Sequence, residues 1–442
     1  MRGLPLNRMA QAVFVVVAIA LAAVACYLYF PGAMTWDSFD QLRQARVNEY
    51  SDWQPPAMAY LWRHLLWLND GPGVMLVFHV SMLCLASVLL CVWSIRRGGY
   101  FGAMFALIPL LPWVVNFEFV IWKDMGMAFA WLLAAAIAIF YADRDRFPLA
   151  AAIAVLGFFL YGFLVRANSP AGAIFFLPFL ASCIFKRKSL QFYGLNALCV
   201  MLAFLVLPKT FNTWVAAESR HPTSYVMFDD LVALRLAGVT GDASILSTDD
   251  LARVASCDLW NKGEVGSAFC IGDTFEDLRA NRYSELKAEW LSVVPNNLGK
   301  YLSYRLGAFM TLLRSPNSET YYISEFRVPQ PPYLVGAETR SPSPGAAWIE
   351  DYVARAAQAL PMLFKPYFWL ALSLLLALLM KVSLTRHSAP YYLLPLSGVS
   401  YVIGFIPITP AGDFRYAYWL CLIATVSLML YLVLVLSRGR TT

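Results

Sequence analysis

The chain contains repeated apolar runs that are long enough to cross a lipid bilayer. The first extends from Met9 to Phe30, about 22 residues, and about 20 apolar residues in a helix span the hydrocarbon core. No small-residue cleavage site follows it, so we interpret it as a retained helix rather than a signal peptide. We expect ten spans, at residues 9–30, 72–93, 100–116, 125–141, 147–165, 171–185, 192–208, 361–380, 388–408 and 416–436. The pattern predicts an all-α polytopic membrane protein with about ten transmembrane helices.

The composition agrees with a membrane protein and excludes two other classes. Hydrophobic residues make up 60% of the 442 residues and charged residues 14%. Soluble domains average about 45–50% apolar and about 25% charged residues, so an ordinary cytosolic enzyme is excluded. The net charge of +6 is too small to indicate a nucleic-acid partner.

Lysine and arginine in the short connections predict the orientation, because positively charged loops stay cytoplasmic. One set of connections holds thirteen: Arg2, Arg8, Arg96, Arg97, Arg144, Arg146, Lys186, Arg187, Lys188, Lys381, Arg386, Arg438 and Arg440. The alternate connections hold six: Arg43, Arg46, Arg63, Lys123, Arg166 and Arg415. We therefore expect both termini in the cytoplasm, and the alternate connections on the periplasmic side of a bacterial inner membrane.

The predicted spans divide the chain into three regions. Residues 1–208 form an N-terminal transmembrane region with a first periplasmic loop at 31–71, and residues 361–442 form a C-terminal one. Between them, residues 209–360 are expected to form a periplasmic domain of mixed structure, with an interfacial helix in the amphipathic run that begins at Tyr301. Its two cysteines, Cys257 and Cys270, are expected to pair in an oxidising compartment. Two free thiols in a cytoplasmic loop are the alternative.

The first outer loop has helical spacing. Four polar residues recur at i, i+3, i+4 and i+7, which places them on one face of a short helix: Asp37, Asp40, Gln41 and Gln44. A second helix is expected to begin at Pro55 or Pro56, because proline suits the first turn of a helix. Asp52 either caps that helix or helps to bind an acceptor.

Ionisable residues gather at the outer ends of the spans, where a charge is costly unless it is paired or wet. They come from three separate stretches: Trp122-Lys123-Asp124, Arg166 with Asn168, and Asp413-Phe414-Arg415-Tyr416. The alternatives are an interfacial ion pair between Lys123 and Asp124, and arginines that snorkel to the membrane surface. His221 either assists an acceptor site or faces solvent.

These motifs resemble a known superfamily. An aspartate in the first outer loop, an Asp-Trp-X-Pro-Pro segment at 52–56, Trp-Lys-Asp at 122–124 and Asp-Phe-Arg-Tyr at 413–416 are similar to the GT-C superfamily of polyprenyl-phosphate-sugar-dependent glycosyltransferases. The resemblance covers most of the membrane region but not residues 240–350. It implies a catalytic role for Asp37. Because relatives often carry His where this chain has Gln54, the resemblance assigns Gln54 no acid–base or metal role. Length and layout are similar to bacterial enzymes that glycosylate surface glycans or type IV pilins.

The residues also suit sugar transfer on chemical grounds. The reaction needs a base for the acceptor proton and cations for the departing phosphate. We assign the base to Asp37, with helix capping as its alternative role, and the phosphate to Lys123, Arg166 and Arg415. Attack opposite the phosphate would invert the anomeric carbon. Supporting or acceptor-binding candidates are Asp40, Asp52, Gln54, Asp124, Asn168, His221 and Asp413.

The expected partners are a polyprenyl-phosphate-linked sugar, a hydroxyl on a glycan or on a protein Ser/Thr, and membrane lipids. No cofactor is required, and no His, Cys or carboxylate spacing supports a metal site, although a divalent cation is compatible with the chemistry. A polymerase or ligase of lipid-linked glycans is the second hypothesis, but the first-loop aspartate favours a monophosphate donor. A transporter or flippase is the third, and polarity confined to one rim disfavours it.

Overall fold

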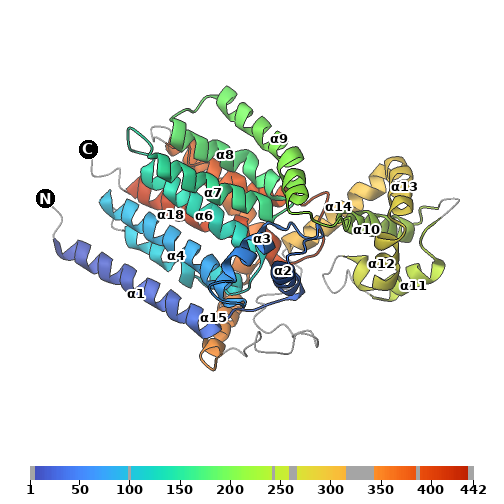
Figure 1. Cartoon of the computed structure of the whole chain (residues 1–442). Coiled ribbons are helices and arrows are strands. Elements are labelled where there is room, and N and C mark those ends of the chain that lie inside the picture. The colour runs from blue at the N-terminus through green and yellow to red at the C-terminus, as the bar shows by residue number, and fades with distance from the viewer. Residues whose placement is uncertain are drawn as a thin grey trace.

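The computed structural model describes residues 5–97, 101–240, 244–257, 266–314, 343–384 and 389–436. Within these ranges all regular structure is helical, and two isolated β-bridges join extended segments. Figure 1 shows a bundle of long helices, with a group of shorter helices, α10 to α14, beyond one of its ends. The predicted all-helical class is confirmed for the described residues.

The described part of the bundle contains nine apolar helices: α1 (Pro5–Tyr29), α4 (Gly73–Arg96), α6 (Lys123–Tyr141), α7 (Leu149–Val165), α8 (Ser169–Phe185), α9 (Leu190–Trp214), α16 (Pro366–Ser383), α17 (Leu393–Ile403) and α18 (Tyr418–Leu436). Six segments are long and apolar enough to cross a membrane: Met9–Tyr29, Gly73–Arg96, Lys123–Tyr141, Leu190–Trp214, Pro366–Ser383 and Phe414–Val435. The helices α7, α8 and α17 are apolar but shorter. A polytopic membrane protein follows from these six segments.

One predicted span is not a continuous helix. Residues 100–116 include a 3₁₀ helix, η1 (Gly102–Leu110), and the beginning of a separate short helix, α5 (Pro112–Glu118). Proline lacks an amide donor and its ring clashes with the preceding turn, so Pro109 and Pro112 interrupt the helical hydrogen bonds. Several apolar side chains of this run, such as Phe105 and Val114, are fully buried in the bundle.

The core of the bundle lies around α6. Its Trp131 packs against Phe176 of α8 and Trp419 of α18, with ring centroids 4.9 and 5.4 Å apart. Gly162 of α7 lies so close that a Cβ atom there would be 2.4 Å from the Trp131 ring. A glycine is therefore needed for α7 to approach α6 at this point.

The first outer loop forms the two predicted helices, α2 (Trp36–Val47) and α3 (Ala57–Leu65). Gln41 and Gln44 are buried on the inner side of α2, and Asp37 is partly exposed. The helix α3 begins directly after Pro56, as the two prolines predict. These two helices lie at the end of the bundle nearest the α10 to α14 group (Figure 1).

The described part of the segment 209–360 is helical rather than of mixed structure. Its elements are α10 (Thr223–Leu236), α11 (Thr248–Cys257), η2 (Ser267–Phe269), α12 (Gly272–Ala280), α13 (Tyr283–Val293), η3 (Pro295–Asn297), α14 (Leu298–Leu313) and α15 (Ala346–Ala359). The glycines and prolines that suggested irregular structure mostly lie between or at the ends of these helices, for example Pro222 and Gly238. Cys257 and Cys270 form a disulfide, which confirms the predicted pairing.

The two ends of the bundle differ in charge. α1 begins and α18 ends at the end remote from α2 and α3 (Figure 1). We call this the basic end, because described cations follow or end α4, α6, α8 and α16 there: Arg96, Arg97, Arg144, Arg146, Lys186, Arg187, Lys188 and Lys381. Arg2, Arg386, Arg438 and Arg440 lie outside the described residues. The cytoplasmic location of the basic end stays a prediction.

Candidate active site

Asp37 and Arg415 are in contact although 378 positions separate them. Arg415 Nη1 donates to Asp37 Oδ2 at 3.1 Å, and Gln54 Nε2 donates to Asp37 Oδ1 at 2.7 Å. Gln41 Nε2 in turn donates to Gln54 Oε1 at 3.3 Å. The side chain of Asp37 is 32% exposed, so a ligand can reach its carboxylate.

The N-terminus of α2 holds Asp37 in this position. Thr35 and Ser38 form the capping box of α2, so the alternative role of Asp37 as the helix cap is wrong. Ser38 Oγ also donates to the Ile121 carbonyl at 2.6 Å, and Trp122 Nε1 donates to Thr35 Oγ1 at 2.7 Å. These bonds fix the start of α2 against the segment that leads into α6.

Arg166 and Asp124 form a buried ion pair next to this contact. Their side chains are 8% and 2% exposed, and Arg166 Nη2 lies 3.1 Å from Asp124 Oδ1. Asp124 therefore pairs directly with Arg166, and Lys123, its partner in the alternative interpretation, interacts electrostatically with both Asp124 and Asp37. Asn168 is the N-cap residue of α8 and interacts with Tyr401 beside Arg166. Because Arg166 is buried, it is not a snorkelling anchor.

Three groups fix the Arg415 guanidinium in addition to Asp37. Arg415 lies in η6 (Phe414–Ala417), whose N-cap residue is Asp413. Arg415 Nε is 2.8 Å from Asp413 Oδ2, and Arg415 Nη2 donates to the Tyr416 hydroxyl at 3.2 Å. The guanidinium carbon also lies 4.4 Å from the centroid of the Trp122 ring. We use the term Asp37 cluster for the ionisable side chains that meet here: Asp37, Lys123, Asp124, Arg166, Asp413 and Arg415.

The cations of the Asp37 cluster keep Asp37 ionised. Burial raises the pKa of Asp37, but Arg415, Lys123 and Arg166, with the hydrogen bond from Gln54, lower it by more, so the pKa lies below its usual value. At Asp413 burial outweighs the nearby cations and raises the pKa. Asp37 is therefore an anion at neutral pH beside three cations.

Two predicted supporting residues have other partners. Asp40 lies one turn further along α2, where it accepts hydrogen bonds from Arg43 at 3.0 Å and Gln44 at 2.6 Å. The ring of His221 stacks on Tyr283 of α13 with centroids 3.9 Å apart. Both side chains are engaged within the outer helices rather than with the carboxylate of Asp37.

Asp52 connects the first outer loop to the segment after α9. Its Oδ1 accepts a hydrogen bond from the Arg220 amide at 2.6 Å, and its Oδ2 accepts one from Ser219 Oγ at 3.2 Å. Its own amide donates to the Glu218 carbonyl at 2.9 Å. The N-cap residue of α3 is Pro56, so a cap at Asp52 is wrong.

Arg314 is a cation near the cluster that the sequence analysis missed. It follows the last residue of α14, is 1% exposed, and lies with its guanidinium carbon 5.7 Å from the Phe414 ring centroid. Burial lowers the pKa of Arg314 to about 10, although Asp413 acts to raise it. The available signal was a cation at the end of an amphipathic run.

Glu118 is a second missed residue. It is fully buried at the end of α5, and neither carboxyl oxygen has a hydrogen-bond partner among the described residues. The available signal was one acidic residue inside an otherwise apolar stretch.

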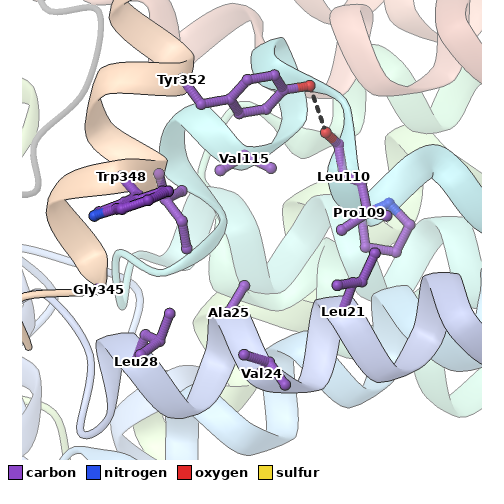
Figure 2. Close-up of a pocket in the computed structure, with 11 residues that line it drawn as sticks. Leu21, Val24, Ala25, Leu28, Pro109, Leu110, Val115, Gly345, Trp348 and Tyr352 are labelled. Atoms are coloured by element: carbon purple, nitrogen blue, oxygen red, sulfur yellow. Dashed lines mark hydrogen bonds between the residues drawn. The ribbon is translucent and has the colours of Figure 1, made fainter.

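An apolar groove of about 480 Å³ lies between α1, α15 and the η1–α5 pair (Figure 2). It is lined by Leu21, Val24, Ala25, Leu28, Pro109, Leu110, Val115, Gly345, Trp348, Ile349 and Tyr352. Tyr29, which follows the last α1 residue of the lining, stacks on Phe119 with centroids 4.6 Å apart. Phe119 is three residues before Trp122, which contacts Arg415. Phe119 and Trp122 belong to the short segment between α5 and α6, which follows the groove-lining residue Val115 in the chain.

Neither a metal-ligand grouping nor a known relative identifies the chemistry of the cluster. Within the described ranges, no three His, Cys, Asp or Glu side chains are grouped so that they could hold a metal ion. Comparison of the chain with protein-family models, curated proteins and solved structures found no match. The functional assignment therefore depends on the charges and contacts of the Asp37 cluster itself.

Proposed function

We propose that the protein is a membrane glycosyltransferase that moves a sugar from a polyprenyl monophosphate to an acceptor hydroxyl on a glycan or a protein. The observation that carries the proposal is the 3.1 Å contact between Asp37 and Arg415, within electrostatic range of Lys123 and Arg166. An accessible carboxylate beside three cations meets both needs of this reaction, a base and a site for phosphate charge.

Each charged group has a role in the transfer step. Asp37 accepts the proton of the acceptor hydroxyl while that oxygen forms a bond to the anomeric carbon. The bond from the anomeric carbon to the phosphate oxygen breaks, and its electron pair goes to the phosphate. Arg415 and Lys123 bind the phosphate, and the buried Arg166 stabilises the phosphate charge electrostatically without contacting it. Attack from the opposite face inverts the anomeric carbon.

Donor binding would make Asp37 a stronger base. Its pKa lies below the usual value because of the three cations, and a weakly basic carboxylate accepts a proton poorly. The donor phosphate brings a negative charge that competes with Asp37 for Arg415 and Lys123. The pKa of Asp37 therefore rises when the phosphate is in place. Proton acceptance is thus favoured only in the donor complex.

The apolar groove suits the hydrocarbon tail of the donor. Its lining is almost entirely aliphatic and aromatic, and one wall is α1, a candidate membrane span with exposed Val24 and Leu21. A prenyl chain could therefore enter the groove from the surrounding lipid. The chain leads from the groove toward the Asp37 cluster through Phe119, which stacks on Tyr29, and Trp122, which contacts Arg415.

We further propose a GT-C-like architecture with ten crossings in a bacterial inner membrane. Six long segments, the shorter helices α7, α8 and α17, and the η1–α5 pair would make these crossings. Both termini would be cytoplasmic and the Asp37 cluster periplasmic. The disulfide between Cys257 and Cys270 supports an oxidising location for the α10 to α14 group.

The decisive experiment compares two aspartates of the same helix. Purified protein receives a panel of polyprenyl-phosphate sugars with glycan and Ser/Thr peptide acceptors, and product and released polyprenyl phosphate are measured. We expect Asp37→Asn to lower the rate about 10²- to 10⁴-fold, because the base is lost. Asp40→Asn is the matched control, since Asp40 pairs with Arg43 and Gln44. Full turnover by Asp37→Asn would remove the proposed base, and sugar release without acceptor would indicate hydrolysis.

A second experiment tests the groove. Ala25→Trp fills it, whereas Val17→Trp adds the same side chain to an exposed α1 position outside the lining. We expect Ala25→Trp to raise the KM for a full-length polyprenyl donor but not for a short-chain analogue that lacks most isoprene units. Equal effects on both donors, or equal effects of both variants, would contradict a tail in the groove.

A further inference from the structure

A second cavity, of about 170 Å³, lies at the basic end of the bundle. One wall comes from the start of α9 and the connection before it, and the opposite wall from the end of α16. The floor is the short segment that leads into α17, where Ala389 and Tyr391 are 2% and 1% exposed. The lining residues are Lys188, Tyr193, Met380, Lys381, Leu384, Ala389, Pro390, Tyr391 and Tyr392.

The cavity combines two lysines with tyrosine hydroxyls. Lys381 Nζ lies 4.4 Å from the centroid of the Tyr392 ring and interacts electrostatically with Tyr193. Tyr193 and Tyr392 are joined by a side-chain hydrogen bond. Lys188 lines the cavity from the opposite wall, and the described lining contains no Asp or Glu. The cavity therefore offers two positive charges and hydroxyl donors to an anion.

The helices that flank the cavity present apolar faces beside it. On α9, Leu190 and Leu195 are 86% and 59% exposed, and on α16, Leu378 and Val382 are 62% and 71% exposed. Both helices are candidate membrane spans. In a bilayer these faces would contact acyl chains, and the cavity would lie at the level where the spans end and head groups begin.

We infer that this cavity binds the phosphate of an anionic phospholipid of the same bilayer. Lys188 and Lys381 contact the phosphate oxygens, a tyrosine hydroxyl donates to the head group, and the acyl chains lie along α9 and α16. Basic pockets between membrane helices bind anionic head groups in this way. A free phosphate would engage the same lysines but would leave both apolar faces without a ligand, so we assign the site to a lipid. The inference does not depend on the proposed function.

Native mass spectrometry of the full chain released from mixed bilayers would test the site. The probes are phosphatidylglycerol, which is anionic, and phosphatidylcholine, which is zwitterionic. We expect wild type to retain phosphatidylglycerol selectively, and Lys188→Gln/Lys381→Gln to retain roughly tenfold less, since each near-surface lysine contributes several-fold to anionic-lipid affinity. Lys188→Arg/Lys381→Arg preserves both charges and is expected to keep the lipid, which would assign the loss in the Gln variant to the missing positive charges.

The matched control removes two charges from the same end but outside the cavity. Arg146 and Arg187 are exposed and do not line it, so Arg146→Gln/Arg187→Gln is expected to lose much less phosphatidylglycerol. Equal losses in the two Gln variants would overturn the inference, because lipid retention would then depend on the total positive charge of the basic end rather than on the cavity. Titration with inorganic phosphate provides the second arm. Lysine-dependent phosphate binding without lysine-dependent lipid retention would also overturn it.

Discussion

The two ends of the helix bundle carry charge in opposite ways. At the basic end, Arg144, Arg146, Lys186 and Arg187 are exposed, so water can solvate their charges. In the Asp37 cluster, cations and carboxylates from helices far apart in sequence are packed against one another and largely removed from water. A buried charge costs several kcal/mol unless it is compensated, whereas an exposed one costs little. The exposed cations at the basic end are explained by their effect on the orientation of the protein in the membrane. The buried charges of the Asp37 cluster are costly, and orientation does not account for them.

One ion pair at each end makes this contrast measurable. Arg166 and Asp124 in the Asp37 cluster are 8% and 2% exposed. Arg97 and Asp143 at the basic end are 27% and 41% exposed. We expect Arg166→Ala to lower the free energy of unfolding by about 3–5 kcal/mol, because Asp124 is left buried and unpaired, and Arg97→Ala by about 1 kcal/mol or less. Reversible unfolding in mixed detergent micelles measures both values.

The same comparison has an internal check. Replacing both partners, as in Arg166→Met/Asp124→Leu, removes the unpaired charge and is expected to recover most of the lost stability. Similar losses for Arg166→Ala and Arg97→Ala would mean that the two ends do not differ in the way their burial indicates.

Arginine-to-lysine substitutions at the two ends of the bundle are expected to affect activity very differently. Arg415 uses separate nitrogens for Asp37, Asp413 and Tyr416, and a lysine cannot reproduce this planar set of donors. We expect Arg415→Lys to lower kcat/KM for the sugar donor about 10²- to 10³-fold. Arg144→Lys at the basic end keeps the charge of an exposed side chain and should leave kcat/KM unchanged. Near-normal turnover by Arg415→Lys would show that the guanidinium of Arg415 is not required for the transfer reaction.

The pH dependence gives the smallest expected effect. Because the pKa of Asp37 is depressed, its charge and its pairing with Arg415 are complete above the ordinary aspartate pKa of about 3.9 and are lost only as the pH falls through the lower folded value. kcat/KM, which reports the free enzyme, should therefore show no acid limb from Asp37 above about pH 4. The acid limb of kcat should lie at higher pH, because bound phosphate offsets the cations. Coincident limbs would contradict the proposed competition for Arg415.

Several features of the fold could be predicted from local patterns. The spacing of polar residues in the first outer loop predicted α2, and the paired prolines predicted the start of α3. The pairing of Cys257 with Cys270 followed from compartment and composition. In contrast, the interruption between η1 and α5 was missed, because a hydropathy average does not register that Pro109 and Pro112 lack amide donors.

The candidate site was predicted in part. Asp37 and Asp40 share a helix face in the sequence pattern, yet Asp37 turns to Arg415 while Asp40 bonds to Gln44. Arg314 and Glu118 carried weak local signals, since each is a single charge next to apolar residues. Their burial depends on packing partners that no short window of sequence contains.

The sequence by itself determined that this is a helical membrane protein, because apolar runs of spanning length and a loop with helical periodicity are properties of neighbouring residues. Tertiary structure alone decided which carboxylate meets which cation. Contacts such as Asp37 with Arg415 and Asp124 with Arg166 depend on how the starts of α2 and α6, the end of α7, and η6 pack together. Charge pairing falls off over a few ångströms, so only the packed bundle distinguishes a true partner from a residue of the right sign.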